Sequence, residues 1–92
     1  MTAFTFRAAG LVQGVGFRWS AQEEARRLGL AGWVCNDDDG AVSGFVQGEE
    51  PALEAYRKWL RRGPRSAKVT SLDWVEAPVT GLRIFTVRSS WG

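Results

Sequence analysis

Histidine is absent from this chain of 92 residues, and cysteine occurs once, at Cys35. Without histidine, the chain lacks the most common metal ligand and the side chain that most often acts as a general base. A single cysteine excludes a disulfide within the chain, and proteins without disulfides are typical of reducing compartments. We therefore expect a cytoplasmic protein that holds no metal ion.

Long apolar segments are missing as well. No run approaches the ~20 apolar residues of a membrane-spanning helix, and the first residues lack the basic and apolar regions of a signal peptide. Lysine and arginine (12) nearly balance aspartate and glutamate (10), which leaves a formal net charge of +2. This balance favours a small anionic ligand over the extended basic surface of a nucleic-acid-binding protein. We expect contact with neither a membrane nor nucleic acid.

The length and the composition bound the fold. Hydrophobic residues make up 45% of the 92 residues, and a chain of this size buries roughly two thirds of the surface that it exposes when unfolded. That is enough for one hydrophobic core and too little for two. We expect residues 1–92 to form a single domain that works as a monomer.

A glycine-rich segment from Gly10 to Arg18 (GLVQGVGFR) joins an apolar stretch to a helical pattern. Gly14 and Gly16 can adopt a positive φ without strain, so successive backbone N–H groups can point into one concavity. The N-terminal end of the following helix and the guanidinium of Arg18 add positive charge beside it. We interpret this segment as a cradle for a phosphate or sulfate anion. It consists of Gln13, Gly14, Val15, Gly16, Phe17 and Arg18.

Neither of two common nucleotide-binding motifs matches the glycine-rich segment. The segment lacks the Lys-Ser/Thr pair of a Walker loop and the spacing of a dinucleotide fingerprint, so neither nucleotide-binding loop fits. On these residues alone, the segment can also be a tight strand-to-helix connection with a surface arginine.

Cys35 is expected to be a packed thiol and not a nucleophile. It has no histidine partner, and Ala41 stands where a C-x₅-R phosphatase loop needs arginine.

The hydrophobic pattern divides the chain into strands and helices. Alternating apolar residues predict strands over 3–12, 32–36, 41–47, 68–75 and 82–87. Helical spacing predicts helices over 17–28 and 50–62. A capping box at Ser20 offers a later start for the first helix, but Phe17 already belongs to its apolar stripe, and we favour the earlier start. Gln22 lies outside this apolar stripe, so we expect it to face solvent.

This order is βαββαβ with a terminal strand, which predicts an α+β fold of the ferredoxin-like kind. In such a fold, two helices cover one face of a mostly antiparallel sheet. The strand after the first helix then runs back toward the glycine-rich segment and brings Asn36 near it. The Asn36 amide, which both donates and accepts hydrogen bonds, can hold a water molecule beside a bound phosphate. An asparagine that bonds its own hairpin turn is the alternative.

Two segments resemble the signatures of the acylphosphatase family: residues 10–18 (GLVQGVGFR) and residues 32–42 (GWVCNDDDGAV). The resemblance extends over the whole chain in length and in the order of elements. It implies that Arg18 is the phosphate-binding arginine, that Asn36 orients the attacking water, and that the backbone N–H groups of residues 13–17 hold the phosphoryl oxygens. The implied activity is hydrolysis of acyl phosphates to a carboxylate and inorganic phosphate, without a metal or a cofactor.

One departure from the family pattern concerns the acidic run Asp37, Asp38 and Asp39. The family often has a neutral residue at position 37. Carboxylates that point into an anion site weaken anion binding, whereas in an exposed turn their effect is screened.

The same residues are compatible with two functions other than hydrolysis. One is an acylphosphatase-like domain that binds acyl or carbamoyl phosphates for another reaction, and the other is a partner-binding domain that keeps the cradle without turnover.

Overall fold

A computed structural model describes residues 1–89 of the chain. Its elements, in chain order, are β1 (Thr2–Leu11), α1 (Phe17–Arg27), β2 (Ala31–Asn36), β3 (Val42–Gly48), α2 (Glu50–Arg62), β4 (Lys68–Ala77) and β5 (Phe85–Arg88). Every predicted strand and helix is present, with ends that differ by a few residues. The predicted α+β, ferredoxin-like arrangement is therefore confirmed.

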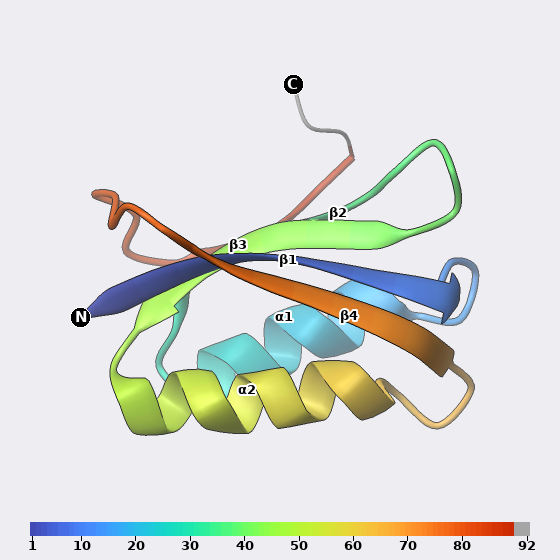
Figure 1. The fold of residues 1–92 in the computed structure, drawn as a ribbon, viewed down its shortest axis with the longest axis horizontal. Coiled ribbons are helices and arrows are strands. Elements are labelled where there is room, and N and C mark those ends of the chain that lie inside the picture. Colours follow the sequence, from blue (N-terminus) through green and yellow to red (C-terminus); the bar gives the residue numbers. More distant parts are fainter. Residues whose placement is uncertain (90–92) are drawn as a thin grey trace.

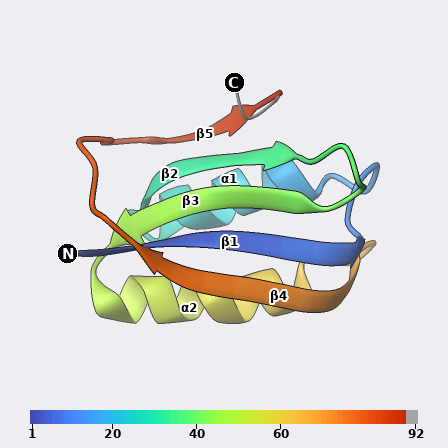
Figure 2. The same ribbon diagram turned by 45° about the horizontal axis from the view of Figure 1, so that its top comes forward.

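The five strands form one sheet in the order β4-β1-β3-β2-β5, which Figure 2 shows from β5 at the top to β4 at the bottom. All neighbouring strands are antiparallel except β2 and β5, which run parallel. The β2–β3 turn is closed by a hydrogen bond of 2.8 Å from the Asp37 N–H to the Ala41 carbonyl. The end of β1, the start of α1 and the end of β2 consequently meet at one edge of the fold (Figure 1).

Both helices cover the same face of the sheet (Figure 1). The core between them centres on Tyr56 of α2, whose ring contacts Phe6 of β1 and Phe85 of β5 edge-on. The Tyr56 hydroxyl donates a hydrogen bond of 3.2 Å to the Ala21 carbonyl of α1. This bond satisfies a buried polar group and ties the two helices together.

The first helix begins at Phe17, as the earlier of the two predicted starts requires. Gly16 precedes it with φ 76°, and its carbonyl accepts the first helical hydrogen bond from the Ser20 N–H at 3.1 Å. Ser20 therefore lies within the helix and does not cap it. The N–H groups of the first turn are directed toward the glycine-rich segment that precedes them.

The prediction that Gln22 faces solvent was wrong, since only 9% of its surface is exposed. Arg18 and Arg26, one helical turn to either side, donate hydrogen bonds to the β5 carbonyls of Arg88 and Phe85. Residues four apart share a helix face, so Gln22 lies against β5 as well. The sequence pattern did not show that β5 joins the sheet beside β2 and extends it beneath this face of α1.

A second, smaller apolar cluster lies on the sheet face opposite the helices and includes Trp33, Cys35 and Phe45, with Leu82 packed against them. The amide of Gln47 donates hydrogen bonds to the Thr80 and Leu82 carbonyls, both at 3.0 Å, and so fixes the segment after β4 beside this cluster. Trp33 serves packing in this cluster, because it is only 9% exposed.

Candidate active site

The segment between β1 and α1 exposes its backbone. Gly14 and Gly16 have φ values of 75° and 76°, in the left-handed region that favours glycine. A Cβ atom built on either residue would meet no atom within 4 Å. These positions therefore require glycine for backbone conformation and not for close packing, and the space in front of the loop is open to a ligand.

The positive end of α1 points into this open space. Gly16 makes no side-chain cap, and the first turn of the helix carries no acidic residue. The free N–H groups of the first turn and the helix dipole therefore meet no carboxylate from the helix itself. This combination favours an anion at the N-terminus of α1.

Arg18 lies in that first turn and is half-buried. Its Nη1 donates a hydrogen bond of 3.1 Å to the backbone carbonyl of Arg88, the last residue of β5. A guanidinium has five N–H donors, and the bond to Arg88 uses one of them. The strand therefore fixes the direction of the Arg18 side chain while the planar group keeps its capacity to bind an anion in bidentate fashion.

Asn36 is the last residue of β2 and, by strand alternation, shares the helix-covered face with Val34. It lines a cavity of about 130 Å³ together with Val12, Gly14, Gly16, Phe17, Arg18 and Trp19. The structure thus brings the two glycines, the arginine and the asparagine around one small space. These residues are distant in the sequence, and they meet because the chain passes through α1 and then returns along β2.

Two residues of the predicted cradle do not line this cavity. Val15 packs against the hydrophobic core. The Gln13 amide donates hydrogen bonds to the carbonyls of Asp37, at 2.7 Å, and Ala41, at 2.9 Å. Gln13 therefore links the loop to the hairpin turn that follows Asn36, which is a role the sequence did not suggest.

The acidic turn is directed toward the other face of the sheet. The Ser43 hydroxyl lies 2.6 Å from both carboxylate oxygens of Asp37, and Arg7 Nε lies 3.6 Å from one of them. Arg7 also forms an ion pair with Asp39. Since Arg7 and Ser43 alternate with core residues along β1 and β3, the Asp37 and Asp39 carboxylates lie away from the helix side, where the cavity is.

The hydrogen bond from the Ala41 N–H, at 3.1 Å, and then the Arg7 guanidinium hold the pKa of Asp39 below its usual value. The pKa of Cys35 shifts in the opposite direction. Burial, followed by the nearby Asp37 carboxylate, raises the pKa of the Cys35 thiol. Cys35 is fully buried on the sheet face opposite the helices, so it is neither ionised nor placed to attack a ligand in the cavity.

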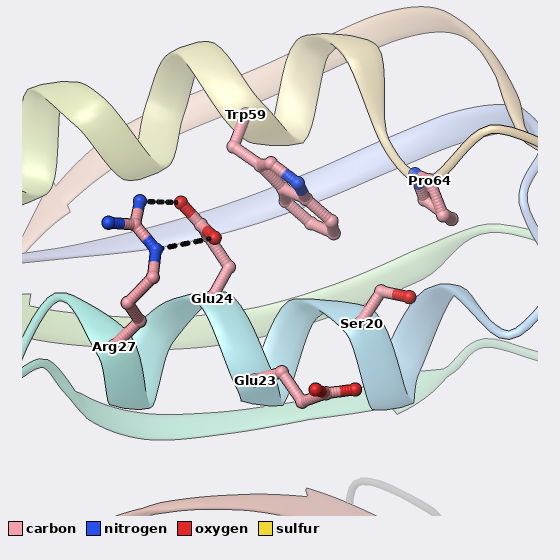
Figure 3. A pocket seen from close by; sticks show the side chains of 6 residues that line it. All are labelled: Ser20, Glu23, Glu24, Arg27, Trp59 and Pro64. Atoms are coloured by element: carbon pink, nitrogen blue, oxygen red, sulfur yellow. Dashed lines mark hydrogen bonds and ion pairs between the residues drawn. The ribbon is translucent and has the colours of Figure 1, made fainter.

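A larger cavity of about 390 Å³ lies in the groove between the two helices (Figure 3). Ser20, Glu23, Glu24 and Arg27 of α1 line it from one side, and Trp59 and Pro64 from the other. Two carboxylates face this groove, and its arginine forms an ion pair with Glu24. An anion is disfavoured there, so size alone does not identify the phosphate site.

Residues 1–89 contain no candidate metal site. These residues hold no group of three or more histidine, cysteine, aspartate or glutamate side chains that could bind a metal ion. Over the same range, neither helix is long and apolar enough to cross a membrane. The cavity at Arg18 and Asn36 is the candidate active site because it brings these two residues together with Gly14 and Gly16.

Sequence reasoning missed three contributions to this site: the Gln13 bridge, the Arg88 carbonyl and the indole of Trp19. Trp19 left a signal in the sequence, because it falls outside the apolar stripe of its helix, and the structure shows that it is 62% exposed. The other two left none, since a backbone carbonyl carries no sequence signature and the partners of Gln13 lie 24 and 28 residues away.

The fold and the cavity together define a small ferredoxin-like α+β protein with a glycine-rich loop and a small cavity at the start of its first helix. The sequence model of the acylphosphatase family matches residues 4–86. An acylphosphatase of Pseudomonas paraeruginosa is 49% identical over 79 residues, which cover 86% of this chain and 87% of that protein. The chain belongs to the acylphosphatase family, whose members are hydrolases.

Solved structures agree with this assignment. The crystal structure of an acylphosphatase from Bacillus subtilis superposes with a TM-score of 0.93 at 37% identity and covers 96% of this chain and 99% of that one. An acylphosphatase from Coxiella burnetii gives a TM-score of 0.91 at 37% identity, with 95% and 92% of the two chains covered. The family resemblance of the two sequence signatures is confirmed.

Proposed function

We propose that this protein hydrolyses the carboxyl–phosphate bond of acyl phosphates and that Arg18 and Asn36 are its catalytic residues. The observation that carries the proposal is their meeting in one cavity with Gly14 and Gly16. In this assignment the backbone N–H groups of residues 13–17 and the Arg18 guanidinium bind the phosphoryl oxygens. Asn36 holds the attacking water. The same loop would bind free phosphate or sulfate.

The reaction is an in-line displacement at phosphorus. The oxygen of the water held by Asn36 forms a bond to phosphorus while the bond from phosphorus to the acyl oxygen breaks, and the electron pair leaves with the carboxylate. The protons of the water pass to phosphate oxygens, so the products are a carboxylate and inorganic phosphate. Positioning and charge stabilisation supply the catalysis, as is usual in phosphoryl transfer.

The chemistry matches the side chains present. A carboxylate is a good leaving group, so an acyl phosphate needs little help from a general acid, whereas an alkyl phosphate ester would need a proton donor or a metal ion. The sequence contains no histidine, and the Cys35 thiol is buried elsewhere. We propose that turnover requires neither a metal nor another cofactor.

Two further proposals concern the state of the protein. We infer that the chain acts as a monomer, because the loop, Arg18 and Asn36 of one chain are sufficient to form the cavity. We infer a cytoplasmic location from the free cysteine and the disulfide-free chain. Sedimentation equilibrium tests the first inference, and cell fractionation with an antibody tests the second.

The test of function is hydrolysis of benzoyl phosphate in the presence of EDTA by the parent protein and by Asn36→Ala. We expect turnover in the parent that EDTA does not reduce. We expect a rate loss on the order of 10²–10³ in the variant, as for loss of one preorganised polar group. Inorganic phosphate should still raise the melting temperature of Asn36→Ala, because the loop and Arg18 remain.

Asp38→Asn is the matched control, since Asp38 is an exposed residue of the same turn and should tolerate the change. A folded parent that binds phosphate but hydrolyses no acyl phosphate would contradict the catalytic assignment. The cradle would then belong to a binding domain. Equal activity of Asn36→Ala and the parent would refute the role of Asn36 alone.

A further inference from the structure

The cavity at Arg18 and Asn36 is small, with a volume of about 130 Å³. In the proposed function, the loop, Arg18 and Asn36 hold the phosphoryl group and the attacking water in it. The acyl group then extends from the phosphoryl group toward the rim of the cavity, against the side chains that form this rim.

Trp19 is the large apolar side chain at that rim. It follows Arg18 in the first turn of α1, lines the cavity, and is 62% exposed. The other large apolar side chains exposed within residues 1–89 are those of Met1, Leu11, Val75, Val79 and Ile84, and none of them lines this cavity. Single exposed apolar residues are ordinary in proteins, so the position of Trp19, not its exposure, sets it apart.

The geometry also separates the two ends of the reaction. Asn36 stands on β2 and Trp19 stands on α1, so a water held at Asn36 and an acyl group at Trp19 occupy different walls of the cavity. An in-line displacement needs this separation, because the water and the leaving carboxylate lie on opposite sides of phosphorus. An indole offers a flat apolar surface that stacks on another flat group.

We propose that Trp19 determines specificity at this site by stacking on the acyl group, and that the protein prefers acyl phosphates with aromatic or other flat apolar acyl groups. This proposal rests on the proposed function, because Trp19 affects turnover only if the protein hydrolyses acyl phosphates. It makes Trp19 a binding residue for the acyl group alone. The phosphoryl group is held by the loop and by Arg18 in the same way in every substrate.

The experiment compares benzoyl phosphate with acetyl phosphate in the parent, Trp19→Ala and Trp19→Phe. We expect the ratio of kcat/KM for benzoyl over acetyl phosphate to fall by about three- to tenfold in Trp19→Ala, the range given by one aromatic contact. Trp19→Phe should keep most of the preference. Ile84→Ala is the matched control, because Ile84 is 63% exposed and lies outside the cavity.

Binding of the non-hydrolysable analogues benzoylphosphonate and acetylphosphonate, measured by calorimetry, gives a second readout that does not need turnover. We expect the parent to bind the benzoyl compound more tightly and Trp19→Ala to lose that preference while its affinity for inorganic phosphate stays within about twofold. A parent that binds both analogues with this preference but hydrolyses neither substrate would refute the proposed function and support the role of Trp19. Equal losses for both acyl groups, or an unchanged ratio, would overturn the role of Trp19.

Discussion

The side-chain amide of Gln13 donates a hydrogen bond of 2.7 Å to the backbone carbonyl of Asp37 and so joins the loop between β1 and α1 to the residue that follows Asn36. A second bond from the same amide reaches the Ala41 carbonyl at 2.9 Å. These bonds hold together the two segments whose residues meet in the candidate active site. The distance between Arg18 and Asn36 therefore depends on the Gln13 side chain, although neither residue accepts a hydrogen bond from it.

Gln13→Ala should lower kcat on benzoyl phosphate by roughly 10- to 100-fold, because small displacements of positioned groups are costly in catalysis. It should also lower the free energy of unfolding by about 1–3 kcal/mol, since two hydrogen bonds are lost and the carbonyls of Asp37 and Ala41 each keep only their backbone donor. Steady-state kinetics and urea unfolding measure the two effects.

Gln47→Ala is the control for Gln13→Ala. Gln47 also donates to two carbonyls, those of Thr80 and Leu82, but it lies near the opposite end of β3. We expect a loss of stability at least as large, because the Gln47 Oε1 also accepts hydrogen bonds from the Thr80 N–H and hydroxyl, with kcat nearly unchanged. An equal fall in kcat in both variants would mean that general destabilisation, and not the link between loop and turn, controls the rate.

Arg18→Ala should reduce the rate by on the order of 10²–10³ or more, because a preorganised charged donor is lost from the site. Arg18→Lys should restore little of it, since an ammonium group cannot reproduce bidentate geometry. Arg26→Ala is the matched control, because Arg26 also lies on α1 and donates to a β5 carbonyl, that of Phe85 at 3.2 Å. Near-parent turnover in either Arg18 variant would refute its catalytic role.

Gly16→Ala should lower the free energy of unfolding by about 1–2 kcal/mol, the usual penalty of a side chain in the left-handed region. Its φ is 76°, and no atom lies within 4 Å of the added Cβ, so backbone strain is the whole effect. Gly81→Ala serves as the control, since that position is equally open and has no positive φ. Equal stability of the two variants in urea unfolding would contradict this account.

Asp39→Asn should change how stability depends on pH. The Ala41 N–H and Arg7 hold the pKa of Asp39 below its usual value, so the folded state favours the ionised carboxylate. The resulting stabilisation is present above the unfolded pKa of about 3.9 and is lost as pH falls through the lower pKa of the folded state. The variant should be less stable than the parent at pH 7 and nearly equal to it at pH 2.

Thermal unfolding of the parent, Asp39→Asn and Asp38→Asn between pH 2 and pH 7 tests this prediction. Asp38→Asn makes the same change of charge in the same turn without the ion pair to Arg7. A stability difference between Asp39→Asn and the parent that stays constant over the whole pH range would count against the proposed linkage.

Cys35 should resist alkylation in the folded protein. Its thiol is fully buried and its pKa is raised by burial and by Asp37, so the reactive thiolate is both scarce and inaccessible at pH 7. Iodoacetamide labelling followed by mass spectrometry should show slow modification without denaturant and rapid modification in urea. Rapid labelling of the native protein, or loss of activity in Cys35→Ser with the fold intact, would contradict this placement.

Local sequence patterns predicted the elements well because each has a local physical cause. Gly16 permits the conformation that ends the loop, and Phe17, Ala21 and Ala25 form the buried stripe of α1. The order of elements then predicted the ferredoxin-like sheet, since few topologies accommodate βαββαβ. The failure at Gln22 marks the limit, because its burial comes from β5, which lies more than 60 residues further along the chain.

By itself, the sequence determined the fold class and the glycine conformations of the loop before α1, because glycine conformations, helix amphipathicity and strand alternation act over a few residues. Only the tertiary structure decided which groups surround the cavity and which way they face. It turned Gln13 toward the hairpin, fixed Arg18 through the Arg88 carbonyl, directed Asp37 to Ser43 and Arg7, and placed Trp19 at the rim. These outcomes depend on strand register and on contacts between distant segments, for which no local pattern exists.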